Sequence, residues 1–501
     1  MDDFSGSAWR IGARRAAVAA HRAAFDLLIR NPGASAASSG AVPAALWLGP
    51  LSFLAVLAVF DGRLAILTAS ILAGLVFLAA ACFRLAAACQ PASPAPRTSL
   101  RRDALPKITV IAALHREAGS VAALIEALSR FDYPADRYEI ALAIEADDHA
   151  TLAAACAAAR PATPSLRIIP VPAIGPRTKP KALNYALALT DGALVAVYDA
   201  EDEPHPGQLR AAAEAFAANP LLGCVQAPLG WYNRTECWLT RMFALEYAAQ
   251  FHVILPFFAR LGWPLPLGGT SNVFARAALS DCGAWDPYNV TEDADLGFRL
   301  ARHGWQAGII TPGTLEEAPV RLKAWTAQRS RWLKGHAISW AVHMREPGAL
   351  RREAGPGAIA ALQASLGANV LSAIVHAPAL VLMAGLLTAS MVSATPPLVL
   401  IPALAGYGSA ILVAWTGARR ARFSPRLRDL MALPAYWLLQ FPAMIRALRE
   451  IAGAPYFWAK TDHAVTARAR TAPDEPIADA HPYGGHGAGL RLVRVAQRQA
   501  V

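Results

Sequence analysis

Residues 108–144 read ITVIAALHREAGSVAALIEALSRFDYPADRYEIALAI, and this pattern sets the architecture of the region around it. Residues 108–114 and 140–144 are short apolar runs typical of buried strands, whereas residues 121–129 have apolar positions at helical spacing. A strand, a helix and a second strand in this order form a βαβ unit, whose strands run parallel. We therefore expect an α/β domain with a mostly parallel sheet.

Polar residues follow the expected strands at the points where ligands usually bind. Further strands are expected at residues 166–170 and 193–198, with a helix at 180–189 leading into the last of them. In such sheets, ligands lie at the carboxyl ends of the strands. Three strands end in candidate groups, namely His115-Arg116-Glu117, Glu145-Ala146-Asp147-Asp148 and Asp199-Ala200-Glu201-Asp202.

The acidic runs have two interpretations. Acidic loops are often only solvated surface, but their recurrence at strand ends favours a shared function. Clustered carboxylates can hold Mg²⁺ or Mn²⁺, and such ions usually also bind substrate phosphates. The metal would offset charge that develops on a diphosphate leaving group. Lys179 and Lys181 would add positive charge for the same group, unless they form an ordinary basic loop and helix start.

Hydrophobic segments of membrane-spanning length flank this domain. Residues 41–60 and 64–83 contain no charged residue, and each matches the roughly 20 residues that cross a bilayer core. A second uncharged block, residues 354–418, accommodates two spans at about 367–392 and 398–416. The sequence therefore predicts two pairs of transmembrane helices.

Arginine residues border both pairs, and the positive-inside rule then places the region between them in the cytoplasm. Residues 429–451 are apolar but contain two prolines and several polar residues, which suits a helix lying in the membrane interface. The net charge of +11 favours an anionic membrane surface and phosphate-bearing substrates, and no nucleic-acid motif accompanies it. The six cysteines show no CxxC spacing, which indicates a reducing compartment without zinc or disulfides.

Five strings, in chain order, resemble the motifs of a known family. They are YDAED at 198–202, PLGGTSN at 266–272, NVTEDADLG at 289–297, QRSRW at 328–332 and WAKT at 458–461. With the flanking hydrophobic segments, they resemble the membrane family 2 glycosyltransferases of the cellulose, chitin and hyaluronan synthase group over roughly residues 104–463. The resemblance implies a GT-A fold, an inverting mechanism and a nucleoside diphosphate sugar as donor.

The resemblance assigns the donor side by position. Asp199 and Glu201 occupy the DxD-like place and would bind the metal and the diphosphate. The more familiar pattern has aspartate at both places, so Asp202 is an alternative to Glu201 in the metal role. Glu145 or Asp147 would meet the nucleoside. The donor-binding positions outside the DxD-like place are Glu117, Glu145, Asp147 and Lys181.

Asp293 falls at the position of the family's catalytic base. Inversion needs a carboxylate that takes the proton from the acceptor hydroxyl, and such proton transfer contributes about 10² to 10⁴ in rate. Without the resemblance, Asp293 would be read as a simple cap for the helix that follows it. With the resemblance, we expect the catalytic role.

Gln328, Arg331 and Trp332 match the family's QxxRW motif. Arginine binds two diphosphate oxygens at once, and the flat face of tryptophan can stack on a pyranose. The same residues would also suit a helix at a membrane surface. The other positions expected to meet the acceptor or the diphosphate are Gly269, Thr270 and Glu292.

The first hypothesis is an enzyme of the bacterial cytoplasmic membrane that lengthens a β-linked polysaccharide at the inner face. UDP-glucose or UDP-N-acetylglucosamine would be its donor, Trp458 and Lys460 would fold over that donor, and an accessory protein could assist export. The alternatives are a single transfer to a lipid acceptor and a catalytically inactive membrane scaffold. An inactive scaffold would not need to keep the motifs intact.

The expected organisation has six parts. They are a basic cytosolic segment (1–40), a transmembrane hairpin (41–87) and a GT-A glycosyltransferase domain (104–345). Interfacial and transmembrane helices (346–418), an interfacial helix with the WAKT segment (419–463) and a flexible tail (464–501) follow.

Overall fold

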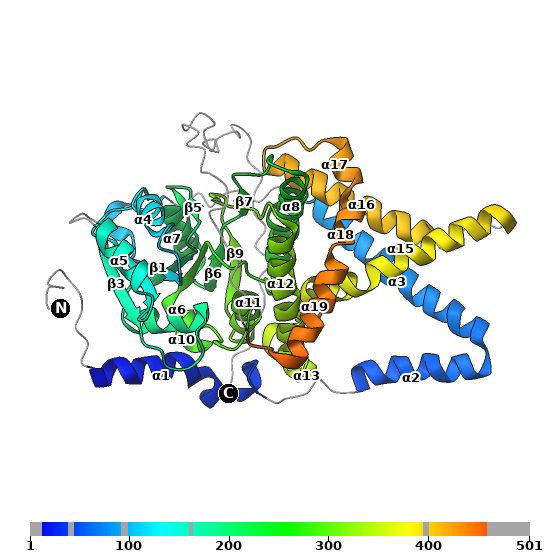
Figure 1. Cartoon of the computed structure of the whole chain (residues 1–501), viewed down its shortest axis with the longest axis horizontal. Coiled ribbons are helices and arrows are strands. Elements are labelled where there is room, and N and C mark those ends of the chain that lie inside the picture. Colours follow the sequence, from blue (N-terminus) through cyan, green and yellow to red (C-terminus); the bar gives the residue numbers. More distant parts are fainter. Residues whose placement is uncertain (1–12, 39–44, 92–98, 160–163, 394–399, 458–501) are drawn as a thin grey trace. The chain divides into compact units, whose positions relative to one another are not determined.

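The central element of the computed structural model is a sheet of seven strands in the order β3-β2-β1-β4-β8-β6-β9 (Figure 1). The structure describes residues 13–38, 45–91, 99–159, 164–393 and 400–457. Strands β1 to β4 are parallel, β8 is antiparallel to both its neighbours, and β9 is parallel to β6. The strands are Ile108–Leu114 (β1), Tyr138–Glu145 (β2), Ser165–Val171 (β3), Leu194–Tyr198 (β4), Leu222–Gln226 (β6), Asn272–Ala275 (β8) and Gln306–Ile309 (β9).

The inner strands are apolar along their length because helices cover both faces of the sheet. Strands β2 and β4 are buried throughout, and Val110 of β1 pairs with Ile140 of β2 and Ala196 of β4. One core lies between the sheet and helices that include α6 and α11, and the other between the sheet and helices that include α4 and α7. This is the two-sided burial expected of a parallel sheet.

The βαβ prediction is confirmed. The expected strands at 108–114, 140–144, 166–170 and 193–198 correspond to β1, β2, β3 and β4, with boundaries shifted by at most two residues. The helices around the sheet are Val121–Leu128 (α4), His149–Ala158 (α5), Lys179–Ala188 (α6), Gln208–Ala218 (α7), Arg276–Asp281 (α10), Glu292–Arg302 (α11), Leu322–His343 (α12) and Pro347–Ala354 (α13).

A second, small sheet has the order β5-β10-β7. Strand β10 pairs antiparallel with β5 and parallel with β7, so the segment that follows β4 lies beside the end of β10. This pairing brings Glu316 of β10 toward the acidic loop 199–202. The strands are Glu203–Pro204 (β5), Leu229–Trp231 (β7) and Thr314–Glu316 (β10).

Long apolar helices lie beside the sheet domain. Among the described residues, two helical stretches are long and apolar enough to cross a membrane, namely Trp238–Arg260 and Ala358–Val381. The second overlaps the span expected at 367–392, whereas the first lies inside the region expected to be cytosolic. The four-span topology therefore stays a prediction. The helices are Ala45–Phe60 (α2), Gly62–Cys89 (α3), Trp238–Ala249 (α8), Gln250–Ile254 (η3, a π-helical turn), Leu255–Arg260 (α9), Ala358–Leu362 (α14), Gln363–Gly367 (η4, also π-helical), Ala368–Ser393 (α15) and Leu400–Arg420 (α16).

The region 429–451, expected as one interfacial helix, is broken into short helices. Pro434 lies in the first turn of α18, where a proline needs no backbone N–H partner but cannot continue a preceding helix. The last of these helices, α19, packs along α12. The helices are Leu427–Met431 (α17), Leu433–Trp437 (α18) and Gln440–Gly453 (α19), and the remaining elements are Ala13–Arg30 (α1), Pro32–Ala34 (η1) and Arg102–Ala104 (η2).

Close packing explains why the NVTEDADLG string ends in a glycine, Gly297. It lies on α11, and a Cβ atom built at this position would approach the carbonyl oxygen of Leu265 to 1.8 Å. Only a residue without a side chain allows α11 to lie this close to the chain that leads into the PLGGTSN string. The glycine therefore fixes the distance between two of the candidate site segments.

Candidate active site

One cavity of about 1890 Å³ gathers most of the predicted site residues. It opens where β1, β2 and β4 end, and its wall also includes the first turn of α11 and one side of α12. The π-helical turns η3 and η4 contribute to the same wall, and such turns are frequent at functional sites. The predicted residues that line it are Glu117, Glu145, Asp199, Glu201, Gly269, Thr270, Glu292, Asp293, Gln328, Arg331 and Trp332.

Lys179 is the lysine that faces this cavity. Its Nζ atom lies 2.5 Å from Asp199 Oδ1, and it also donates to the carbonyl oxygen of Gly269. Burial would lower the pKa of this ammonium group, but Asp199, Asp293 and Glu292 outweigh that effect and raise it. Lys179 therefore stays charged, at the place where a diphosphate would need a cation.

Lys181 does not have the role expected for it. Its side chain is fully buried, its Nζ atom lies 2.9 Å from Glu145 Oε1, and it donates to the carbonyl oxygen of Pro172 at 3.2 Å. Lys181 does not line the cavity, whereas Glu145 does. Lys179 and Lys181 lie two residues apart in the first turn of α6, so their side chains point in different directions. Lys181 holds Glu145 in place from the side away from the cavity.

Two acidic residues expected at the donor lie outside the cavity wall. Asp147 forms an ion pair with Arg177 at 2.8 Å, and both side chains are about half exposed. Asp202 is fully buried, where its Oδ2 atom accepts hydrogen bonds from the backbone N–H of Asp199, at 2.7 Å, and from Thr270 Oγ1. Asp202 therefore fixes the loop that presents Asp199, and its metal role stays a prediction.

Burial raises the pKa of Asp202 well above its usual range, and the charges of Asp199 and Glu201 raise it further. The same causes act on Glu316. Burial raises the pKa of Glu316 most, and the charges of Asp202, Glu201 and Asp199 raise it further. Glu316 lines the cavity and was not predicted. This side of the site therefore holds more carboxyl groups than can all be ionised.

Asp293 lies in the first turn of α11 and does not cap it. Thr291 occupies the N-cap position without a capping hydrogen bond from its side chain, and the Oδ1 atom of Asp293 accepts a hydrogen bond from the indole Nε1 of Trp285 at 3.2 Å. Burial raises the pKa of Asp293 to about 6, with Lys179 opposing the rise and Asp199 adding to it. A carboxylate with such a pKa is a better proton acceptor near neutral pH than an ordinary aspartate.

Glu292, the residue before Asp293, is only 1% exposed and its two carboxylate oxygens have no hydrogen-bond partner among the described residues. Burial, together with the neighbouring Asp293, raises its pKa well above the usual range. Unpartnered buried polar atoms are rare in proteins and often mark the place of a ligand. Glu292 is therefore a candidate to meet a sugar hydroxyl.

The QRSRW string lies on α12 and sends its residues in two directions. Gln328, Arg331 and Trp332 line the cavity, and burial lowers the pKa of the Arg331 guanidinium. Arg329, which was not predicted, makes a two-pronged ion pair with Glu246 of α8 at 2.7 and 2.6 Å. Its guanidinium also lies 4.9 Å from the centre of the Trp332 ring.

The geometry of Arg329 fixes the orientation of the motif helix. A two-pronged arginine pair has little rotational freedom, and its cation-π contact constrains the neighbouring tryptophan. The Trp332 ring also lies 5.8 Å from the ring of Phe243 and 6.1 Å from that of Tyr247. Arg329 and Arg331 both line the cavity, and the ion pair with Glu246 fixes Arg329 there.

The WAKT residues Trp458 and Lys460 lie outside the described residues. Phe457, the last described residue before them, lies beside α12, where Lys334 donates to its carbonyl oxygen at 2.8 Å. Phe457 itself lines the cavity. Lys334 also pairs with Glu450 of α19 at 3.0 Å.

The carboxylates fit a metal ion that arrives together with its substrate. Within the described part of the chain, no three Asp, Glu, His or Cys residues are grouped as a ready-made metal site. Asp199 and Glu201 do line the cavity beside the cationic Lys179. Mg²⁺ is commonly held by one or two carboxylates and completed by substrate phosphates, so these two residues suffice for that mode of binding.

Several site residues carried no signal in the sequence. Trp285 and Glu316 lie outside every motif, and only the fold brings them to Asp293 and to the acidic loop. Arg329 stands inside the QRSRW string, where its spacing gave no reason to separate it from Arg331. Lys179 was expected together with Lys181, and the fold shows which of the two lines the cavity.

Residues 106–335 match the family "Glycosyltransferase like family 2". Among curated proteins, the β-monoglucosyldiacylglycerol synthase of Synechocystis is 31% identical over 46% of this chain and 48% of its own length. A probable glucomannan 4-β-mannosyltransferase of Arabidopsis thaliana is 29% identical over 28% of this chain and 32% of its own. The chain therefore spans about half or less of the length of these relatives.

Among solved structures, a mannosyltransferase from Pyrobaculum calidifontis in complex with GDP-Man and Mn²⁺ is similar in fold. Its TM-score is 0.50 at 20% sequence identity, and the match covers 78% of this chain and 97% of that one. At this identity the likeness concerns the fold, which is GT-A-like with a mostly parallel sheet. Residues 106–335 thus match a family 2 glycosyltransferase domain in sequence, and the fold is GT-A-like.

Proposed function

We propose that this protein transfers a hexose, with inversion, from a UDP-sugar to the hydroxyl group of a membrane lipid. The observation that carries the proposal is the single cavity, in which Asp293 shares one wall with the acidic loop, Lys179 and Arg331. UDP-glucose and UDP-N-acetylglucosamine are the donors we put first. The names of the relatives support hexosyl transfer to either a lipid or a glycan.

The reaction assigns one task to each group. Asp293 takes the proton of the acceptor hydroxyl while this oxygen bonds to the anomeric carbon. The bond from that carbon to the diphosphate breaks on the opposite face, and the nucleoside diphosphate leaves. Lys179 and Arg331 offset the negative charge that develops on it, since charge stabilisation placed in advance is usually the largest single contribution to catalysis.

Asp199 and Glu201 would hold Mg²⁺ or Mn²⁺, which when bound supplies further positive charge for the diphosphate. Glu145, fixed by Lys181, and Glu117 line the cavity where β2 and β1 end and would meet the nucleoside. Gly269, Thr270 and Gln328 also line the cavity and would contact the sugar or the acceptor.

The size and composition of the cavity favour a lipid acceptor. Pockets for small ligands are usually about 300–1,000 Å³, so a cavity of 1890 Å³ accommodates a donor and a second molecule. Its part away from Asp199 is bordered by helices α3, α15 and α16. The apolar residues there include Phe77, Phe83, Leu371, Val375, Ala410 and Val413.

A growing polysaccharide, the acceptor put first on sequence grounds, is the second candidate. Trp332 and Tyr247 line the cavity and offer aromatic faces on which a pyranose could stack. A polymer would pass along such faces, whereas acyl chains would occupy the apolar part. The two candidates therefore need different regions of the same cavity.

The test uses the full-length protein in lipid nanodiscs with Mg²⁺ or Mn²⁺ and radiolabelled UDP-glucose or UDP-N-acetylglucosamine. One sample contains dioleoylglycerol and the other an oligosaccharide, and the products are sized. Asp293→Asn should abolish product formation, whereas Asp103→Asn, at an exposed aspartate, should not. A labelled lipid supports the proposal, and a long polymer would replace it with the second candidate.

A pair of variants on α16 tests the apolar region directly. Ala410→Trp fills the cavity and should raise the KM for dioleoylglycerol without changing hydrolysis of the donor in the absence of acceptor. Leu404→Trp, at a position 68% exposed on the same helix, is the matched control. An equal effect of both variants would argue against acyl chains in the cavity.

A further inference from the structure

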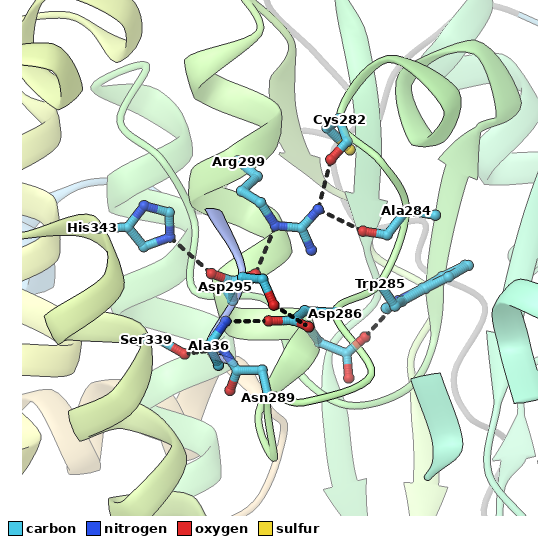
Figure 2. A network of polar contacts seen from close by, with 12 residues as sticks. Ala36, Cys282, Ala284, Trp285, Asp286, Asn289, Asp295, Arg299, Ser339 and His343 are labelled. Atoms are coloured by element: carbon cyan, nitrogen blue, oxygen red, sulfur yellow. Dashed lines mark hydrogen bonds and ion pairs between the residues drawn. The ribbon is translucent and has the colours of Figure 1, made fainter. Parts of the chain in front are cut away.

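The loop that precedes α11 is held by the amino-terminal segment of the chain. We define the base loop as residues 282–291 and the amino-terminal brace as residues 32–38. In the base loop, Asp286 is 1% exposed, and its Oδ2 atom accepts a hydrogen bond from the backbone N–H of Ala36 at 2.6 Å (Figure 2). Ser35 Oγ donates to Asp286 Oδ1 at 3.2 Å.

The brace is fixed from its other side by Arg345, which follows α12. This side chain donates to the carbonyl oxygens of Gly33 at 3.1 Å, Ser35 at 2.9 Å and Ser38 at 2.9 Å. One guanidinium group thus binds three carbonyl oxygens of the brace and holds the brace against Asp286. The brace is far from the base loop in sequence, so only the tertiary fold creates this contact.

A second attachment connects α1 to the same loop. Asn184 of α6 accepts from the backbone N–H of Trp285 at 3.2 Å and donates to the Trp285 carbonyl at 2.8 Å. Its amide also donates to the carbonyl oxygen of Ala23 on α1 at 3.2 Å. Both attachments of the amino-terminal segment therefore end at Trp285 or at the residue after it.

Trp285 is the residue that contacts the catalytic carboxylate. Its side chain is fully buried, and its indole N–H donates to Asp293 Oδ1 at 3.2 Å. A hydrogen bond to a reacting group fixes the orientation of that group, and its loss typically costs about 10- to 100-fold in activity. Any movement of Trp285 would therefore change the position of Asp293.

From these contacts we infer that the amino-terminal brace is a positioning element of the active centre, acting on Asp293 through Asp286 and Trp285. The inference rests on the proposed role of Asp293 as the base. The opposite face of the base loop is held by Arg299, which donates to the carbonyl oxygens of Cys282 and Ala284 (Figure 2). The brace supplies the contacts on the side that α11 does not reach.

Hydrogen exchange of the full-length protein tests the contact without any assay of activity. Asp286→Asn and Arg345→Met should speed amide exchange in residues 285–293 and leave strand β2 unchanged. Ser35→Ala removes the hydrogen bond to Asp286 and the one that Ser35 Oγ accepts from the backbone N–H of Ala37, and it serves if a stronger variant fails to fold. Asp26→Asn is the control, because Asp26 pairs with Arg30 on an exposed face of α1. Unchanged exchange at 285–293 in all brace variants would overturn the inference.

Kinetics distinguish positioning from mere stabilisation. With UDP-glucose and dioleoylglycerol, Asp286→Asn should lower kcat at least about twofold, as expected for coupled neighbours, with the KM for UDP-glucose unchanged. Trp285→Phe should lower kcat about tenfold, and adding Asp286→Asn should cause no further loss. Losses that multiply would show that Asp286 does not act through Trp285. If no variant or wild type is active, the proposed function fails, but the exchange result still decides whether the brace holds the loop.

Discussion

Asp293 and Asp295 lie two residues apart on α11 and both are buried, yet their carboxyl groups have opposite properties. Asp293 faces the cavity, and burial raises its pKa to about 6. Asp295 lies 2.7 Å from Arg299 Nε and 3.1 Å from His343 Nε2, and Arg299 brings its pKa below the usual range despite its burial. The same residue type therefore faces the cavity on one side of the helix and forms a buried ion pair on the other.

The difference shows that burial alone does not make a carboxylate reactive. Successive residues of a helix point in different directions, so positions 293 and 295 meet different neighbours. Asp295 pairs with the Arg299 guanidinium, whose attraction offsets the free-energy cost of removing the carboxylate from water. Asp293 shares Lys179 with Asp199 and accepts a hydrogen bond from the indole N–H of Trp285. The availability of partners thus separates the two roles.

The largest effect we expect is on catalysis. Asp293→Asn should lower kcat by about 10² to 10⁴, because the amide cannot accept the proton of the acceptor. Donor binding and thermal unfolding measured on the same sample should show that the site is otherwise intact. Asp295→Asn should lower thermal stability far more than kcat per folded molecule. A larger kcat loss in Asp295→Asn would reverse the comparison.

The next largest effect concerns the structural pair. Arg299→Met leaves Asp295 buried without its main partner and should reduce the free energy of unfolding by about 3–5 kcal/mol, the usual cost of breaking a buried ion pair. Chemical unfolding in detergent micelles measures this change. The double variant Asp295→Leu with Arg299→Met should recover part of the loss. No recovery would mean that Arg299 stabilises mainly through its bonds to the base loop.

A smaller effect is expected on the pH dependence. Asp293 must be deprotonated to act, so kcat should rise with pH through about 6. The Lys179 ammonium stabilises the charged form and lowers this pKa. Lys179→Met should therefore move the acidic limb of the kcat profile to higher pH, by about one unit. A shift to lower pH would show that the lysine does not face the ionised base.

The smallest effect should come from a pair near the surface. Asp147 and Arg177 are about half exposed, so Asp147→Asn should change the free energy of unfolding by less than about 1 kcal/mol and leave the KM for donor nearly unchanged. Glu145→Gln, two residues earlier, should raise this KM clearly, because Glu145 lines the cavity. A strong effect of Asp147→Asn on the KM for donor would show that Asp147 contacts the nucleoside.

Much of the active site follows from local pattern. A parallel sheet directs the ends of its strands to one edge, so motifs such as YDAED were expected to meet there. The same reasoning could not separate residues that are neighbours on one turn. It named Lys179 and Lys181 together and offered Asp202 as a metal ligand, although only Lys179 of these three lines the cavity. Those choices depend on which face of a turn the rest of the chain covers.

The sequence by itself determined the βαβ order and the identity of the loops that carry carboxylates, because apolar periodicity and strand-end placement are local properties, whereas the candidate base came from the resemblance of motifs. Only the tertiary structure decided that Asp295 and not Asp293 pairs with Arg299, that Arg329 is held by Glu246, and that residues 32–38 reach Asp286. Partner, burial and pKa depend on segments distant in the chain, and such contacts exist only once the chain has folded.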